Sequence, residues 1–228
     1  ILPLFCLMAV YFHAQWQGGR RLLKPLLWTG LAVGFFLVGT LHETQLVQKF
    51  FHRTLPAQMD PLRRVRGWRA TALVAERARH QLIREGKPAF IIGEHYGLTG
   101  LMSFYLTEAH QDISENPLVF YRWFPTPKNQ FFFWRSYQSR VGQNAIYVQQ
   151  VDLPKLPSDW IPRWLKGEKI VVPNDPKPLP PPRDVVRQFA TVTDLGVSEI
   201  FYDGRVFRRV QLFACRDLQP PSQWNTAP

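Results

Sequence analysis

Residues 88–97, Pro-Ala-Phe-Ile-Ile-Gly-Glu-His-Tyr-Gly, decide the fold class of the chain. The short apolar run 88–92 predicts a buried strand, and the glycine-bounded run 93–97 predicts a tight turn. A helix is expected directly after the turn, over residues 98–107. A buried strand that turns sharply into a helix is typical of a parallel α/β sheet.

The alternation of helix and strand continues on both sides of this segment. Apolar residues recur every three or four positions over 69–85 and predict an amphipathic helix that ends at Gly86. Strands are expected over 118–122 and 144–149, with a helix over 129–140 between them. This alternation predicts a three-layer-like α/β domain with a mostly parallel sheet and right-handed crossovers.

The C-terminal part of the chain predicts a β-hairpin. Asp203-Gly204 lies between two β-rich runs, 197–202 and 205–215, and this dipeptide favours a tight hairpin turn. The hairpin is expected at one edge of the sheet. Residues 173–182 are rich in proline, so they are expected to form a stiff connector or a lid-like loop.

Two apolar stretches precede the α/β region. Residues 22–41 form an apolar stretch of about 20 residues, the length that spans the hydrocarbon core of a bilayer. Residues 1–14 are expected to be the end of another span, so the chain is expected to be a fragment of a longer protein. A long buried core helix is the alternative for 22–41, but no polar face recurs there at helical period.

The expected domain organisation follows from these stretches. It comprises transmembrane helices over 1–45, a linker over 46–68 and a soluble α/β domain over 69–228. Arg20, Arg21 and Lys24 lie between the two apolar stretches, and the positive-inside rule makes this short loop cytoplasmic. The α/β domain is therefore expected outside the cytoplasm, in a multi-pass protein of the plasma (inner) membrane. Basic residues beyond the second stretch argue weakly for the opposite orientation: Lys49, Arg53, Arg63, Arg64 and Arg66.

Positive charge is concentrated beside the apolar stretches. The chain has 28 Lys and Arg residues against 17 Asp and Glu, a formal net charge of +11. Residues 1–69 hold nine basic and two acidic residues, a net charge of +7, and the remainder of the chain carries +4. The high pI alone suggests a nucleic-acid binder, but this distribution argues against one, since such flanking charge is typical of membrane proteins.

Four segments of the chain resemble, in the same order, the C-terminal part of glycosyltransferase family 39. They are Asp60-Pro-Leu-Arg-Arg-Val-Arg-Gly-Trp68, Gly93-Glu-His-Tyr-Gly-Leu-Thr-Gly-Leu-Met-Ser-Phe-Tyr105, the run from Asn129-Gln130 to Trp134 with Gly142-Gln-Asn-Ala-Ile-Tyr-Val148, and the closing Tyr202-Asp-Gly-Arg205. The family is related to protein O-mannosyltransferases and to lipid A aminoarabinose transferase. The resemblance covers nearly the whole chain and implies a GT-C fold, in which many membrane helices precede a soluble domain outside the cytoplasm.

The resemblance also implies a function for the parent protein. Members of the family transfer a sugar from a polyprenyl-phosphate carrier to a lipid or protein acceptor. Their catalytic Asp lies in the first extracytoplasmic loop, which these residues do not contain, so no catalytic residue is assigned and the chain alone is expected to be inactive. Membrane lipid and the lipid-linked sugar are the implied partners, and no cofactor is expected in this part. The sequence does not indicate an oligomeric state.

A membrane-tethered ligand-binding or sensor domain without enzymatic activity is the alternative function. The two functions differ in what lies upstream of the chain. Many further membrane spans with an acidic first loop indicate a transferase, whereas a start codon shortly before Ile1 indicates a tethered domain.

Glu94, His95 and Tyr96 are the first candidates for contact with a sugar or acceptor. They follow a buried strand, at the carboxyl end of the expected sheet, where open α/β sheets bind their ligands. Tyr96 is alternatively a plug between the sheet and the next helix. An acid–base pair of Glu94 with His95 is disfavoured, because adjacent residues on a turn usually diverge.

Asn129, Gln130 and Trp134 are the second group of candidates. They combine amide groups with an aromatic ring, a composition that suits the faces of sugars. The alternative is structural: Asn129 is then a helix cap, and residues 132–134 belong to the core or to a membrane-facing wall.

Other kinds of chemistry lack their sequence patterns. The sequence contains no His-x-x-x-His pair, which argues against a metal site. The glycines of 93–100 match neither a dinucleotide fingerprint nor a P-loop, so a structural turn is favoured over a nucleotide site. A Gly-x-Ser-x-Gly elbow, typical of hydrolases, does not occur either. Arg208 and Arg209 are expected on a solvated strand face.

Overall fold

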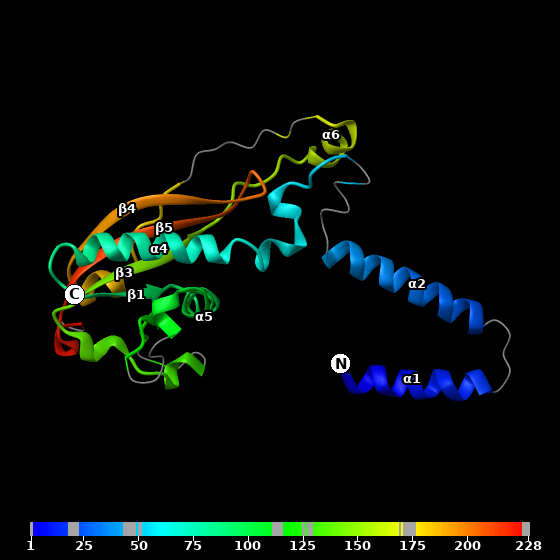
Figure 1. Ribbon diagram of the computed structural model, residues 1–228, viewed down its shortest axis with the longest axis horizontal. Helices are drawn as coiled ribbons and strands as arrows, with labels where there is room; N and C mark the ends of the chain where they lie inside the picture. Colours follow the sequence, from blue (N-terminus) through cyan, green and yellow to red (C-terminus); the bar gives the residue numbers. More distant parts are fainter. Residues whose placement is uncertain are drawn as a thin grey trace. The chain divides into compact units, whose positions relative to one another are not determined.

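The chain is described here from a computed structural model (Figure 1). The structure describes residues 2–17, 23–42, 49, 52–110, 116–124, 126, 130–168, 170 and 177–224. By its internal contacts the chain divides into two compact units, Ile1–Leu55 and Pro56–Pro228, and each is considered by itself. Residues 56–67, which the sequence assigns to a linker, belong to the second unit.

The first unit contains helices α1 (Leu2–Gln17) and α2 (Leu23–His42). They coincide with the two apolar stretches of the sequence. Among the described residues, however, no helix is both long and apolar enough to cross a membrane, so the expected transmembrane helices are not supported. With 16 residues, α1 is about 24 Å long, shorter than the hydrocarbon core of a bilayer. The first turn of α2 contains Lys24 and Pro25.

The second unit is built on a mixed sheet. Its described strands follow the order β2-β1-β3-β5-β4. β1 (Ala89–Gly93) pairs in parallel with β2 (Val119–Tyr121) on one side and with β3 (Asn144–Val151) on the other. β5 (Arg205–Leu218) is antiparallel to β3, and β4 (Phe189–Tyr202) is antiparallel to β5 at the edge. The α/β class is thus confirmed, but the sheet is mixed rather than mostly parallel, because the hairpin adds two long antiparallel strands.

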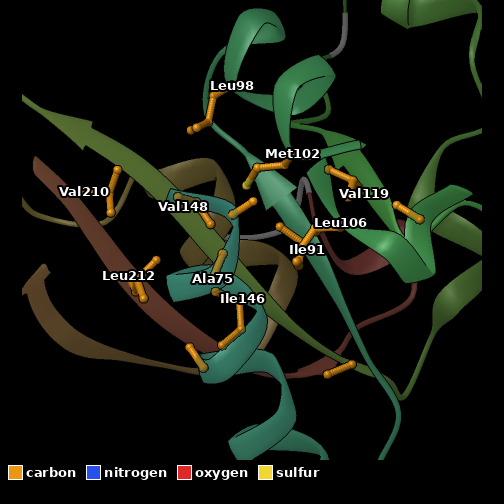
Figure 2. Packing of buried hydrophobic residues seen from close by; sticks show 14 of the residues in the cluster. Ala75, Ile91, Leu98, Met102, Leu106, Val119, Ile146, Val148, Val210 and Leu212 are labelled. Atoms are coloured by element: carbon orange, nitrogen blue, oxygen red, sulfur yellow. The ribbon is translucent and has the colours of Figure 1, made fainter. Parts of the chain in front are cut away.

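Helices α4 (Trp68–Ile83) and α5 (Tyr96–Tyr105) cover one face of this sheet. Figure 2 shows Ala75 of α4 and Met102 of α5 among the buried apolar side chains of this face, together with Ile91 of β1 and Ile146 and Val148 of β3. Alternate residues of each strand reach this face, because successive strand side chains point to opposite sides. Both helices lie within two residues of their predicted bounds, so local periodicity predicted them correctly.

Short elements cover the opposite face. Phe90 and Tyr147 of the central strands pack there against Tyr137, Phe213 and Trp224. The rings of Phe90 and Tyr137 lie 5.6 Å apart between centroids. The covering elements are η5 (Tyr137–Arg140), α7 (Arg183–Gln188) and η6 (Pro221–Gln223). Strands β1 and β3 are consequently buried on both faces, as parallel strands of α/β proteins usually are.

The continuous helix expected over 129–140 is wrong. The described residues of this segment form two separate 3₁₀ turns, η4 (Gln130–Phe133) and η5. Ser136 separates them in an extended conformation, and its hydroxyl accepts a hydrogen bond from the backbone N–H of Gln138 at 3.3 Å. Aromatic residues favour helix only weakly, and a serine that caps the following turn ends the first one.

The remaining described elements are also short. They are η1 (Ala57–Met59), η2 (Pro61–Arg64), η3 (Thr107–His110) and α6 (Trp160–Lys166). Of the proline-rich segment, residues 177–182 adopt neither helix nor strand, and residues 173–176 lie outside the described part.

The predicted C-terminal hairpin is confirmed. Asp203 and Gly204 have φ angles of 52° and 69°, the left-handed conformation that a type I′ turn requires at both central positions. The strands are longer than predicted because β4 begins at Phe189. A register shift between Asp194 and Val197 interrupts the pairing of β4 with β5. The early part of β4 therefore does not follow a simple alternation of apolar and polar residues, and the sequence did not predict it.

Arg208 and Arg209 are buried, so their predicted position on a solvated strand face is wrong. Nη2 of Arg208 donates to the backbone carbonyl of Arg63 at 2.9 Å, and its guanidinium lies 3.4 Å from the ring centroid of Trp68. Burial, together with the charge of Arg63, lowers the pKa of Arg208 to about 10. Arg209 donates from Nε and Nη2 to one carboxylate oxygen of Glu199, at 3.0 and 2.8 Å. Both arginines therefore connect parts of the second unit.

We predict that Gly93→Ala destabilises the second unit by about 1–3 kcal/mol. A Cβ at this position would lie 2.5 Å from Oγ1 of Thr99, whose side chain is buried, and 3.1 Å from its backbone nitrogen. Gly100→Ala is the matched control, because its Cβ would meet the nearest atom, in Phe131, at an ordinary 3.6 Å. The control should be neutral or stabilising by up to about 1 kcal/mol through helix propensity. Equal chemical stability of the two variants in denaturant would contradict this packing.

We also predict that Cys215 is chemically inert in the folded protein. It is fully buried on β5, and burial raises the pKa of its thiol to about 12. Almost no thiolate, the reactive form, is therefore present near neutral pH. A Cys6→Ser variant leaves Cys215 as the single thiol for measurement with a chromogenic thiol reagent. The thiol should react only after denaturant is added, and rapid labelling of the native protein would refute the burial.

Candidate functional site

The carboxyl ends of the parallel strands β1, β2 and β3 meet at one edge of the sheet. After β1 the chain enters α5 on one face, whereas after β2 it continues to η5 on the opposite face. Neighbouring strands whose connections leave on opposite faces create the crevice in which open α/β sheets bind ligands. The candidate site is this edge, which the sequence also indicates.

The segment after β1 is fixed by its own backbone contacts. Nδ1 of His95 accepts a hydrogen bond from the backbone N–H of Gly97 at 3.1 Å and so caps α5. Oγ1 of Thr99 donates to the backbone carbonyl of His95 at 3.1 Å. The first turn of α5 is therefore held against the end of β1. His95 is exposed at the edge and also has a structural role as the cap of α5.

Glu94 connects the same segment to β3. Its backbone N–H donates to the carbonyl of Val148 at 3.0 Å, and its carboxylate accepts from the backbone N–H of Gln150 at 2.9 Å. The Glu94 carboxylate thus accepts from the backbone of β3, whereas the His95 imidazole accepts from the backbone of α5. The two side chains have separate backbone partners, so these hydrogen bonds do not join them in an acid–base pair.

Aromatic side chains gather beside this segment. We call Tyr96, Tyr121, Phe131 and Trp134 the edge aromatic cluster. The ring centroid of Phe131 lies 6.5 Å from that of Tyr96, 5.9 Å from that of Tyr121 and 4.5 Å from that of Trp134. Tyr96 is 50% exposed and Trp134 is 46% exposed, so the cluster presents aromatic surface to solvent. Tyr96 does not fill the space between sheet and helix, contrary to its alternative role as a plug.

Charged and hydroxyl groups lie at the end of β2. Nε of Arg122 donates to Oδ2 of Asp184 at 2.7 Å, and its guanidinium lies 4.9 Å from the ring centroid of Phe124. Nη1 of Arg122 is 3.5 Å from the hydroxyl of Tyr147. Burial raises the pKa of Tyr147 well above its ordinary value, although Arg122 opposes the shift. Tyr147 is therefore a neutral hydrogen-bonding group here.

Tyr137 holds the chain after β2 against the core through two hydrogen bonds of its hydroxyl. Its hydroxyl donates to Oε1 of Gln188 at 2.6 Å and accepts from the backbone N–H of Trp123 at 3.3 Å. The side chain is fully buried, and this burial raises its pKa strongly. The loop after β2 is consequently attached to the core and to α7.

The structure describes two of the second group of candidates from the sequence, Asn129, Gln130 and Trp134. Gln130 is exposed at the start of η4, and Trp134 belongs to the edge aromatic cluster. Asn129 lies outside the described residues. Phe133 is 85% exposed, so its predicted core position is wrong, while a membrane-facing position stays a prediction. The structure brings Tyr96 and Trp134 into one cluster through Phe131, and that connection is the main gain over the sequence.

Sequence reasoning missed several residues of this edge. Arg122 is the last residue of the second predicted strand, 118–122, and directly follows β2 as observed, so the rule that places ligands at strand ends would have indicated it. Tyr121 and Phe131 carry no such signal, because their contact with Tyr96 depends on the path of the chain between β2 and β3.

Comparison with known proteins gives no relative to guide these assignments. No protein-family model, curated protein or solved structure matches the chain.

We predict that two tyrosines of this region differ sharply in their contribution to stability. Tyr96→Ala should change the free energy of unfolding by less than about 1 kcal/mol, because the side chain is half exposed. Tyr137→Ala should cost about 3 kcal/mol or more, since it leaves a cavity and two unpaired polar groups. Denaturant unfolding of both variants measures the difference. A large loss of unfolding free energy in Tyr96→Ala would show that this side chain is packed in the core.

Proposed function

We propose that the chain is the C-terminal accessory part of a membrane glycosyltransferase, and that its α/β domain docks the sugar head group of a lipid-linked donor or acceptor. The parent enzyme transfers a sugar from a polyprenyl phosphate to a lipid or protein. The catalytic groups belong to regions outside this chain, so the domain contributes binding and orientation rather than proton transfer.

The edge aromatic cluster is the observation that carries this proposal. Aromatic rings offer a flat apolar face, and sugars present flat faces of C–H groups bounded by hydroxyls. Two charged groups at the same edge are suited to hydrogen bonding with sugar hydroxyls: the Glu94 carboxylate and the Arg122 guanidinium. A few polar groups beside an aromatic surface are typical of small-molecule sites.

The apolar helices α1 and α2 support a membrane location for the parent protein. Large apolar side chains on both helices are exposed within the described residues, including Leu7, Tyr11, Trp28, Phe35 and Phe36. Exposed apolar surface of this extent is typical of sites that interact with membranes or with other proteins. The positive-inside rule, applied to Arg20, Arg21 and Lys24, is a sequence argument for an α/β domain outside the cytoplasm at the plasma (inner) membrane, although no helix among the described residues is long and apolar enough to span one.

The proposal is tested in the full-length parent enzyme with Tyr96→Ala and Trp134→Ala. Each variant should raise the apparent KM for the lipid-linked sugar about tenfold, equivalent to the roughly 1.4 kcal/mol of one aromatic contact, with little change in kcat. Phe201→Ala, a 60% exposed aromatic residue on the hairpin, is the matched control and should leave KM unchanged. Thermal unfolding of each variant confirms that the fold is kept.

Two results would separate the possible failures. Unchanged KM in both edge variants, with transferase activity present, would remove the edge from sugar binding. Sugar binding without any transfer by the parent protein would instead favour the membrane-tethered, non-enzymatic binding domain.

A further inference from the structure

A second group of ionisable side chains lies where α4 meets η3, apart from the carboxyl edge of the sheet. Glu76 and His80 are four residues apart on this helix, so they lie on the same face. Glu108 approaches them from η3, after the end of α5. The nearest ligand atoms of these three residues all lie within 4.8 Å of one another.

Arg79 positions one of these side chains. It is buried, and its Nη1 donates to the backbone carbonyl of Ala89 at the start of β1, at 3.3 Å. Its Nη2 donates to Oε2 of Glu108. The other oxygen of that carboxylate, Oε1, is directed to Nε2 of His80 at 3.1 Å. An outer hydrogen bond that orients a carboxylate is the usual support of a metal ligand.

The imidazole of His80 has conflicting neighbours. Nε2 lies 3.1 Å from the Arg79 Nη2 donor and 3.1 Å from the Glu108 Oε1 acceptor. A nitrogen that carries a proton suits only Glu108, and a nitrogen with a lone pair suits only Arg79. A cation shared by Nε2 and Oε1 would use both lone pairs while Arg79 keeps its bond to Oε2.

The geometry points to a binding site for a divalent transition-metal ion such as Zn²⁺, held by Glu76, His80 and Glu108. Zinc is bound by imidazole nitrogen and carboxylate oxygen, often by three protein ligands with water in the fourth position. Mg²⁺ and Ca²⁺ fit less well, because they prefer oxygen ligands and more of them.

Only small adjustments complete this site. Ligand atoms about 2.1 Å from a tetrahedral ion are about 3.4 Å from one another. His80 and Glu108 are both 46% exposed at the side chain, so they have space to rotate toward the ion.

A bound ion would connect α4 to η3 and so fix the C-terminal end of α5. The sequence predicts no metal site because Glu108 lies 28 residues after His80, and only the fold brings the two together. The inference does not depend on the proposed sugar docking, since it concerns other residues.

Zinc binding to the full chain in mild detergent tests this inference by isothermal titration calorimetry, with Co²⁺ absorption as a second measure. We expect one saturable site, with a visible Co²⁺ spectrum that Zn²⁺ abolishes. His80→Gln and Glu108→Gln should each weaken Zn²⁺ affinity by at least about 100-fold, since even outer partners of a metal ligand contribute 10–100-fold. His95→Gln and Glu85→Gln are matched controls at other positions and should retain wild-type affinity.

Circular dichroism without metal checks that each variant is folded. If a ligand variant is unfolded, the milder Glu76→Gln replaces it in the comparison. Absence of saturable binding by the wild-type chain would overturn the inference. Equal affinity in the wild type and in the His80→Gln, Glu108→Gln double variant would overturn it too, because the ion would then bind elsewhere.

Discussion

The close approach of β1 and α5 at Gly93 is the constraint on which the rest of the site depends. Gly93 has no side chain, so Thr99 and Met102 of the helix lie directly against the end of the strand. The His95 cap and the hydrogen bond of Thr99 then hold the first turn of α5 in place. Because β1 lies between β2 and β3, this turn determines the side on which Tyr96 meets the edge aromatic cluster.

Much of the fold follows from local signals in the sequence. Strand β1, helices α4 and α5, strand β3 and the hairpin turn are short-range features, set by apolar periodicity, a helix-ending glycine and Asp203-Gly204. The sequence fails where tertiary contacts override local pattern. Ser136 divides a segment that is apolar enough to suggest a helix, and Trp68 with backbone carbonyls covers an arginine that strand alternation would expose.

The candidate site, like the fold, was predictable only where local signals in the sequence define it. Glu94, His95 and Tyr96 follow from the rule for strand ends, whereas Phe131, which joins Tyr96 to Trp134, depends on how the chain returns from β2 to β3. The group on α4 and η3 has the same origin, since its residues are distant in sequence. Sequence periodicity predicts which residues share a face of one helix or strand. It does not predict which residues of different elements come into contact.

The central claim is that a sugar head group docks at the carboxyl edge of the sheet. Hydrogen–deuterium exchange of the full-length protein, with and without a polyprenyl-phosphate sugar, tests it most directly. If a sugar docks there, amide exchange slows on ligand addition in the segments 94–100 and 130–134 and changes little in α4. Protection confined to α4 or to the hairpin, or no protection of the α/β domain at a saturating concentration of the sugar lipid, would contradict it.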